Sequence, residues 1–191
     1  MLVASLHQAI ADVLPTRLGF YENWLHAERL RGGSIGLAPL SAVLSFLRLE
    51  GEAYDLVTTR AGEYAADWTV QSMAPLRRAV IKRSPEWMRR RLMLRVARHL
   101  VRSTYQGSRP TARLRRRTAE VSLGASVFCV VREPVGRPLC GFYAAALSRL
   151  LALFDLPMRA AVVACRGTGK PECVLAISVG VARQDPSVEA A

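Results

Sequence analysis

The chain has 191 residues, of which 51% are hydrophobic and 22% are charged, and this composition excludes wholesale disorder. The longest apolar run, at 142–154, is interrupted by Ser148 and Arg149 and is too short to span a membrane. The formal net charge is +12, and most of the basic excess lies between residues 77 and 117. A local positive field of this kind makes nucleic acid and an anionic membrane surface candidate partners.

The length of the chain is typical of one domain. We expect this domain to span residues 1–184, with a helical part at about 1–50 and a core at about 52–183, before a flexible tail at 185–191. The first fourteen residues lack the basic start and the unbroken apolar run of a signal peptide, which predicts a cytoplasmic protein. In that compartment the four cysteines are expected to be thiols or metal ligands.

Apolar residues at helical spacing predict three helices in the first part of the chain, at 6–14, 18–28 and 39–50. A short strand is expected at 53–58. The next helix carries Tyr64 and Trp68 on one face, because residues four apart lie on the same side of a helix.

A further helix is predicted from Ser84 to about Tyr105, since Ser-Pro-Glu supplies a cap, a first-turn proline and an acid near the positive end of the dipole. It has an apolar stripe on one face and a basic stripe on another, the latter made by Arg91, Arg95, Arg98 and Arg102. Residues 107–117 are expected to form an arginine-rich loop. Alternating apolar residues predict a strand at 121–131, with Gly124 placed for a bend or bulge.

The last third of the chain predicts an apolar helix at 138–154 and two strands at 158–164 and 173–181, joined by a glycine-containing loop. Helices lie early, strands lie late, and the chain closes on a hairpin. This order predicts an α+β fold, with an antiparallel sheet packed against helices, rather than a parallel α/β fold.

Three cysteines mark this last third. Cys140 opens the apolar helix, Cys165 follows the first strand of the hairpin, and Cys173 begins the second. This pattern resembles the 4-vinyl reductase domain family, whose fold is shared with TRAPP-type trafficking subunits. The runs 61–64 and 92–107 also resemble the bacteriochlorophyll-pathway members of the family, so that the likeness covers roughly two thirds of the chain.

The resemblance implies a zinc site. In family members that hold zinc, a glutamate three residues before the second cysteine completes the ligand set, and Val162 stands at that position here. A closed structural zinc site uses four ligands, so Cys140, Cys165 and Cys173 need a substitute for the glutamate. Glu172 is one candidate, if the loop turns it inward, and Cys129 is another, because neighbouring strands can converge. Without a fourth ligand the three thiols would be small buried hydrophobic side chains.

The family binds phenols, acyl chains or tetrapyrroles, so the resemblance also implies a cavity for a hydrophobic small molecule between the helices and the sheet. We expect aromatic side chains to line it and basic side chains to meet ligand carboxylates at its mouth. The candidate ligand-binding residues are Tyr64, Trp68, Arg95, Arg98, His99, Arg102, Phe128 and Phe142. Aromatic residues at such spacing are equally typical of an ordinary core.

These observations favour an accessory protein that binds or presents a hydrophobic ligand, such as a tetrapyrrole or bacteriochlorophyll precursor. A reductase acting on a vinyl group of such a precursor is one alternative, and a TRAPP-like or sensor-type adaptor without a ligand is another. No residue is predicted to be catalytic, because the three histidines have no serine or cysteine partner in a known triad order.

No nucleotide cofactor is predicted either. The run Gly167–Lys170 lacks the first glycine and the Ser/Thr of a phosphate-binding loop, and no nicotinamide or flavin fingerprint is present. The apolar surplus of the composition predicts a homodimer. An acidic protein surface is a further candidate partner for the arginines, ahead of nucleic acid and a membrane surface.

Overall fold

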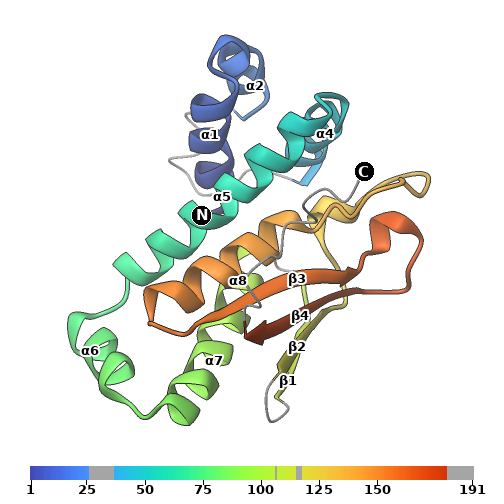
Figure 1. The fold of residues 1–191 in the computed structure, drawn as a ribbon. Coiled ribbons are helices and arrows are strands. Elements are labelled where there is room, and N and C mark those ends of the chain that lie inside the picture. Colours follow the sequence, from blue (N-terminus) through green and yellow to red (C-terminus); the bar gives the residue numbers. More distant parts are fainter. Residues whose placement is uncertain (26–36, 106, 115–117, 180–191) are drawn as a thin grey trace, which may run out of the picture.

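The computed structural model describes residues 1–25, 37–105, 107–114 and 118–179 (Figure 1). Its helices are α1 (Leu2–Val13), α2 (Leu18–Leu25), α4 (Leu37–Leu49), α5 (Glu52–Gln71), α6 (Pro75–Arg83), α7 (Glu86–Thr104) and α8 (Gly141–Leu153). Its strands are β1 (Pro110–Leu114), β2 (Thr118–Leu123), β3 (Met158–Ala164) and β4 (Cys173–Val179). The expected α+β class is confirmed. The predicted tail at 185–191 lies outside the described residues.

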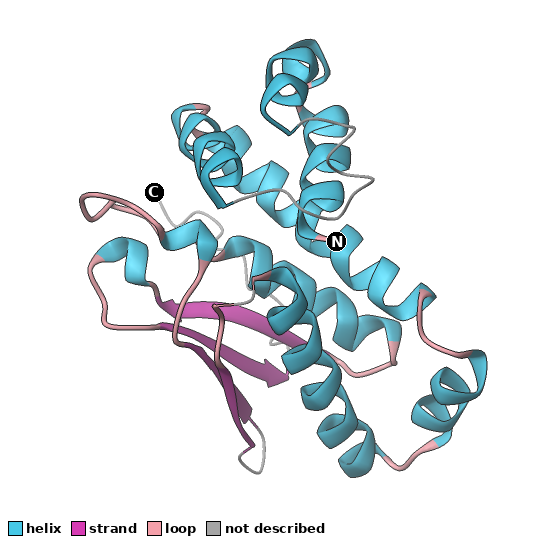
Figure 2. Cartoon of the chain, turned by 180° about the vertical axis from the view of Figure 1, so that it is seen from behind, coloured by secondary structure: helices cyan, strands magenta, loops and turns pink. Residues whose placement is uncertain are grey.

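The four strands form one antiparallel sheet in the order β1-β2-β4-β3. Successive side chains of a strand point to opposite faces of the sheet. Every second residue of β2 and β4 is buried, which gives one inward row of Ala119, Val121, Leu123, Cys173, Leu175 and Ile177. Helices α7 and α8 cover this inner face (Figure 2). None of the described helices covers the outer face (Figure 1), and Val163 of β3 is 61% exposed there.

Helix α8 lies between the sheet and α5, and it buries five large side chains and Ala146 over a wide face. The contact between α5 and α8 is close because Gly62 has no side chain. A Cβ atom at position 62 would lie 2.3 Å from the carbonyl oxygen of Phe142 and 3.0 Å from the Cβ atom of Ala145. Only glycine therefore fits at this crossing without moving one helix.

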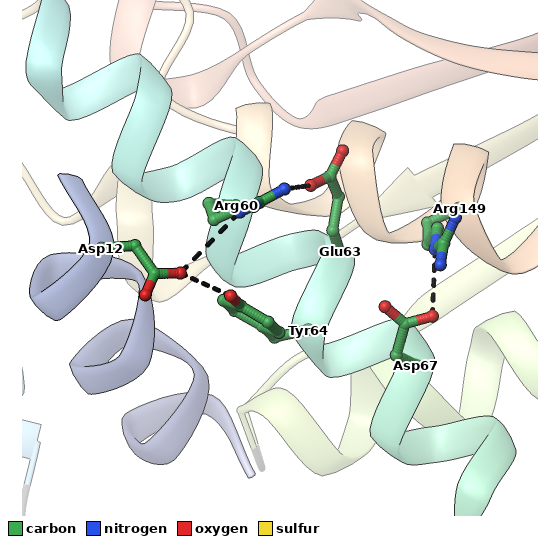
Figure 3. A network of polar contacts seen from close by, with 6 residues as sticks. All are labelled: Asp12, Arg60, Glu63, Tyr64, Asp67 and Arg149. Atoms are coloured by element: carbon green, nitrogen blue, oxygen red, sulfur yellow. Dashed lines mark hydrogen bonds and ion pairs between the residues drawn. The ribbon is translucent and has the colours of Figure 1, made fainter.

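Helix α1 packs on the side of α5 that faces away from α8. Polar side chains at this contact form a network, in which Tyr64 donates a hydrogen bond to Asp12 and Arg60 pairs with Glu63 (Figure 3). On the other side of α5, Arg149 of α8 forms an ion pair with Asp67 at 3.0 Å. The helices thus form three successive layers over the sheet, with α1, α2 and α4 outermost (Figure 1), and buried side chains pack between the layers. None of the described helices is long and apolar enough to cross a membrane.

The predicted strand at 53–58 is wrong, because these residues form the first turns of α5. Gly51 has a φ of 64°, which turns the chain sharply after α4 and lets a new helix begin at Glu52. Tyr54, Val57 and Ala61 are then buried at helical spacing on one face of α5. Burial against neighbouring helices thus overrides the strand preference of tyrosine and valine.

Two predictions in the middle of the chain are also corrected. The expected loop at 107–117 contains β1, whose residues 110–114 pair along their whole length with β2. The strand predicted at 121–131 ends at Leu123, and a 3-10 turn at Val127–Cys129 follows it. Gly124 marks the break, and Val127 and Phe128 are both buried within the turn, which an alternating strand would not allow. Helix α6 is not predicted by the sequence pattern.

Candidate functional site

Four cysteines from four different parts of the fold converge at one end of the sheet. Cys129 ends the 3-10 turn after β2, and Cys140 caps the start of α8. Cys165 follows β3 and Cys173 begins β4. The hairpin register brings the last two together, because Ala164 pairs with Val174 and the cysteines are the next residues outward.

The Sγ atoms of these residues lie within 4.8 Å of one another. Cys129 is 3.1 Å from Cys140, 3.4 Å from Cys165 and 3.5 Å from Cys173. Cys140 is 3.6 Å from Cys165 and 3.0 Å from Cys173. Zn–S bonds of about 2.3 Å place tetrahedral sulfurs about 3.8 Å apart, so a small adjustment of the four free thiols would accommodate one ion.

Backbone N–H groups face two of the four thiols. The backbone N–H of Leu139 donates to Cys165 Sγ at 3.3 Å, and the N–H of Arg166 donates to Cys173 Sγ at 3.4 Å. The contact with Cys129 lowers the pKa of the Cys165 thiol, whereas it raises the pKa of the Cys140 thiol. Charge on one sulfur therefore opposes ionisation of the next, and a divalent cation would relieve this repulsion by replacing the shared protons.

The structure thus brings together all three of the predicted cysteines and adds Cys129 as the fourth. Of the two substitutes that the sequence suggests, Glu172 is exposed and does not belong to the cluster. Val162 is half-buried and packs against the hydrophobic core. Cys129 reaches the other thiols from a 3-10 turn rather than from a strand, a geometry that the alternation at 121–131 does not indicate.

An aromatic cluster adjoins the cysteines. Phe128 precedes Cys129, while Phe142 and Tyr143 follow Cys140 in the first turn of α8, and all three aromatic side chains are fully buried. The rings of Phe128 and Phe142 stack with centroids 4.9 Å apart, and Tyr143 meets both edge-on. The Tyr143 hydroxyl is buried and has no partner in ordinary hydrogen-bond geometry among the described residues, although the hydroxyls of Ser108 and Ser126 lie close to it. Burial raises the pKa of Tyr143, and weak hydrogen-bond contacts with the Ser108 and Ser126 hydroxyls lower it by less.

The other predicted ligand-binding residues lie elsewhere. Tyr64 and Trp68 stack on α5 with ring centroids 5.8 Å apart, and Tyr64 points toward α1 (Figure 3). Arg98 and Arg102 of α7 line a groove of about 540 Å³ together with Arg109.

Two more of these residues also lie on α7. Arg95 lines a different groove, between α6 and α7, and His99 is exposed. The predicted set is therefore distributed over the α1–α5 contact, the outer face of α7 and the aromatic cluster. Tyr143 belongs to the last group and is not in the predicted set. The apolar pattern of α8 in the sequence does not indicate that the Tyr143 hydroxyl would lack a well-placed hydrogen-bond partner.

No protein-family model matches the chain, and no curated protein does. Among solved structures the chain is similar to the phenol-responsive sensory domain of the transcription activator PoxR, crystallised with phenol. The TM-score is 0.51 at 15% identity, over 76% of this chain and 75% of that one. The two chains share a fold.

Proposed function

We propose that this protein binds a small aromatic or hydrophobic molecule and that a zinc ion at the four cysteines holds the binding site in place. The observation that carries the proposal is the unpartnered Tyr143 hydroxyl, buried among stacked aromatic rings directly beside the four thiols. The fold it shares with a phenol-responsive domain supports the same interpretation.

A buried hydroxyl without a partner calls for an explanation, because almost all such groups in folded proteins are hydrogen-bonded. A phenol-like ligand would supply a hydrogen-bond partner for Tyr143 and a further aromatic ring for the cluster. Its ring would pack against Phe128 and Phe142, and its hydroxyl would bond to Tyr143. Ser126 and Ser108, both buried, are further polar groups beside the Tyr143 hydroxyl. Apolar surroundings with a few polar groups are typical of small-molecule sites.

The proposed zinc is structural. When bound, it would cross-link the four thiolates, and because all four positions are sulfur from the protein, none remains open for a substrate. Its effect on the ligand is indirect. Cys129 directly follows Phe128 and Cys140 lies two residues before Phe142, so fixing the two sulfurs would restrain the two rings. The protein is therefore proposed to sense or present its ligand rather than to transform it.

The test is a calorimetric titration with phenol, using the intact protein and Tyr143→Phe. Removing an unpartnered buried hydroxyl leaves no group unsatisfied, so the variant should be at least as stable as the parent. Phenol affinity should fall about two- to tenfold, the effect of losing one hydrogen bond. The matched control is Tyr21→Phe, which removes a buried tyrosine hydroxyl that is bonded to Glu50 at 3.0 Å.

The control variant should lose stability and keep its phenol affinity. Equal phenol affinity in all three proteins would remove Tyr143 from the site. A parallel titration with protoporphyrin addresses the larger ligand that the sequence suggests, whose carboxylates would suit the groove of Arg98 and Arg102. Saturable binding of protoporphyrin alone would favour that groove. No saturable binding of either compound would leave the adaptor interpretation.

A further inference from the structure

The positive charge of the protein is concentrated in one segment. Residues 77–117 hold 15 of the 27 basic residues and one of the 15 acidic residues, so this segment carries a formal charge of +14 and the rest of the chain carries −2. Ten of these basic residues belong to α6 and α7. Among the described residues only one of the ten, Arg90, forms an ion pair, with Glu86. The charge of this helical pair is therefore almost uncompensated.

Large apolar side chains are exposed on the same two helices, α6 and α7. Leu76 is 77% exposed, Val80 55% and Trp87 58%. Leu76 and Val80 lie one turn apart on α6 and line a groove of about 410 Å³ between α6 and α7. Leu92 and Val96 of α7 form its other wall, and Arg77 and Arg95 also line it. An apolar surface and a dense positive charge thus occupy one helical hairpin.

The two kinds of side chain also share one face of α7. Trp87, Arg91 and Arg95 follow each other at intervals of four residues, which places them on one side of the helix. The guanidinium group of Arg91 lies over the indole ring of Trp87, 5.5 Å from its centroid. Helix α6 and the start of α7 lie at the end of the molecule opposite α2 (Figure 1), where no other described element covers them.

We propose that the α6–α7 hairpin, residues 75–104, docks on the surface of an anionic lipid bilayer. Anionic headgroups attract arginine side chains near the membrane. The interface below them accepts leucine, valine and tryptophan side chains. Nucleic acid would satisfy the arginines and leave Leu76 and Val80 without an apolar environment. The bilayer is therefore the partner that matches both the positive charge and the exposed apolar side chains of the hairpin. The proposed docking is peripheral, since none of the described helices could cross a membrane.

The test measures partition of the intact protein onto vesicles by sedimentation. Vesicles of phosphatidylcholine alone are compared with vesicles that contain one third phosphatidylglycerol. The protein should bind the anionic vesicles and bind the neutral ones far more weakly. Replacing Arg77 and Arg95 with glutamine should lower the partition coefficient about 25-fold, because each arginine near an anionic surface accounts for about a fivefold change.

The matched control is Arg159→Gln with Lys170→Gln, which removes the same charge from exposed positions outside the hairpin and should change partition much less. A second pair tests the apolar contact. Trp87→Ser should weaken binding, whereas Trp24→Ser, at a 40% exposed tryptophan on α2, should not. Thermal unfolding of each variant confirms that it is folded.

A spectroscopic signal reports insertion directly. With Trp24 and Trp68 replaced by phenylalanine, Trp87 is the only tryptophan of the chain. Its emission should then move to shorter wavelength when anionic vesicles are added. Equal partition of the hairpin and control variants, or equal binding to both vesicle types, would overturn the proposal. So would binding to a DNA duplex without binding to anionic vesicles. The phenol titration uses neither lipid nor this hairpin, so either proposal can fail alone.

Discussion

Gly62 tests whether the close crossing of α5 and α8 determines the stability of the fold. The perturbation is Gly62→Ala. In a helix interior this change alone would stabilise the chain by about 1 kcal/mol, since alanine has the higher helix propensity. At position 62, however, the new Cβ atom would lie 2.3 Å from the backbone carbonyl oxygen of Phe142, which no rotamer change can move.

The clash requires one helix to move by about 1 Å, and overpacking of this kind typically costs about 1–3 kcal/mol. Because the obstacle is backbone, we expect the upper end of that range and a net loss of about 1–2 kcal/mol after the propensity gain. For a chain of this length that corresponds to a fall in Tm of about 2–8 °C. The assay is thermal and urea unfolding followed by circular dichroism.

Gly19→Ala is the matched control, because Gly19 lies in α2 and a Cβ atom there would meet nothing within 4 Å. The same chemical change should therefore raise Tm by about 2–4 °C at that site. The two variants are expected to differ in sign. A stabilised Gly62→Ala would refute the reasoning, because it would mean that α5 and α8 do not approach as closely as the structure shows.

Three further predictions follow from the cysteine centre, the α1 network and the apolar surplus. Cys129→Ser should lower the zinc content of the purified protein as much as Cys173→Ser does, measured by elemental analysis, and unchanged zinc in both would exclude a four-thiolate site. The Tyr64 hydrogen bond lowers the pKa of Asp12, so the stability that this carboxylate contributes should be present above about pH 4 and be lost as the pH falls through the lowered value. Tyr64→Phe should raise the Asp12 pKa in a carboxylate NMR titration, and an unchanged value would contradict the contact in Figure 3. Light scattering should give twice the chain mass if the predicted homodimer forms, and a constant monomer mass over micromolar concentrations would exclude it.

The sequence predicts elements whose signals are local. The Ser-Pro-Glu run marks the start of α7, although the helix begins at Glu86 and the Ser84 hydroxyl donates to the carbonyl of Val80 in α6 instead of capping α7. The bounds of β3 agree with the predicted strand at 158–164. In both cases adjacent residues decide the structure. The strand at 53–58 fails for the opposite reason, since its residues are buried by α8 and other distant elements, and no window of sequence contains that information.

The residues of the candidate site also fall into those that local sequence predicts and those that depend on packing. Spacing and resemblance find Cys140, Cys165 and Cys173, because all three lie at the ends of well-predicted elements. Cys129 joins them only through the 3-10 turn after β2, which depends on how the sheet packs. The aromatic residues show what periodicity cannot predict, which is the element that a helix face contacts. Periodicity places Tyr64 and Trp68 on one stripe of α5, but it does not say whether that stripe meets the sheet or, as Tyr64 shows, α1.

The order of the cysteines along the chain has a consequence for assembly. Cys129, Cys140 and Cys165 are all synthesised before Cys173, and Cys165 and Cys173 become neighbours only when β3 and β4 have paired. A fully coordinated ion therefore requires a finished hairpin, while the unfolded chain offers four scattered thiols. Metal loading would then report how far the sheet has formed during biosynthesis. Substitutions that slow pairing of β3 and β4 should reduce the metal content of newly made protein even when all four cysteines are intact.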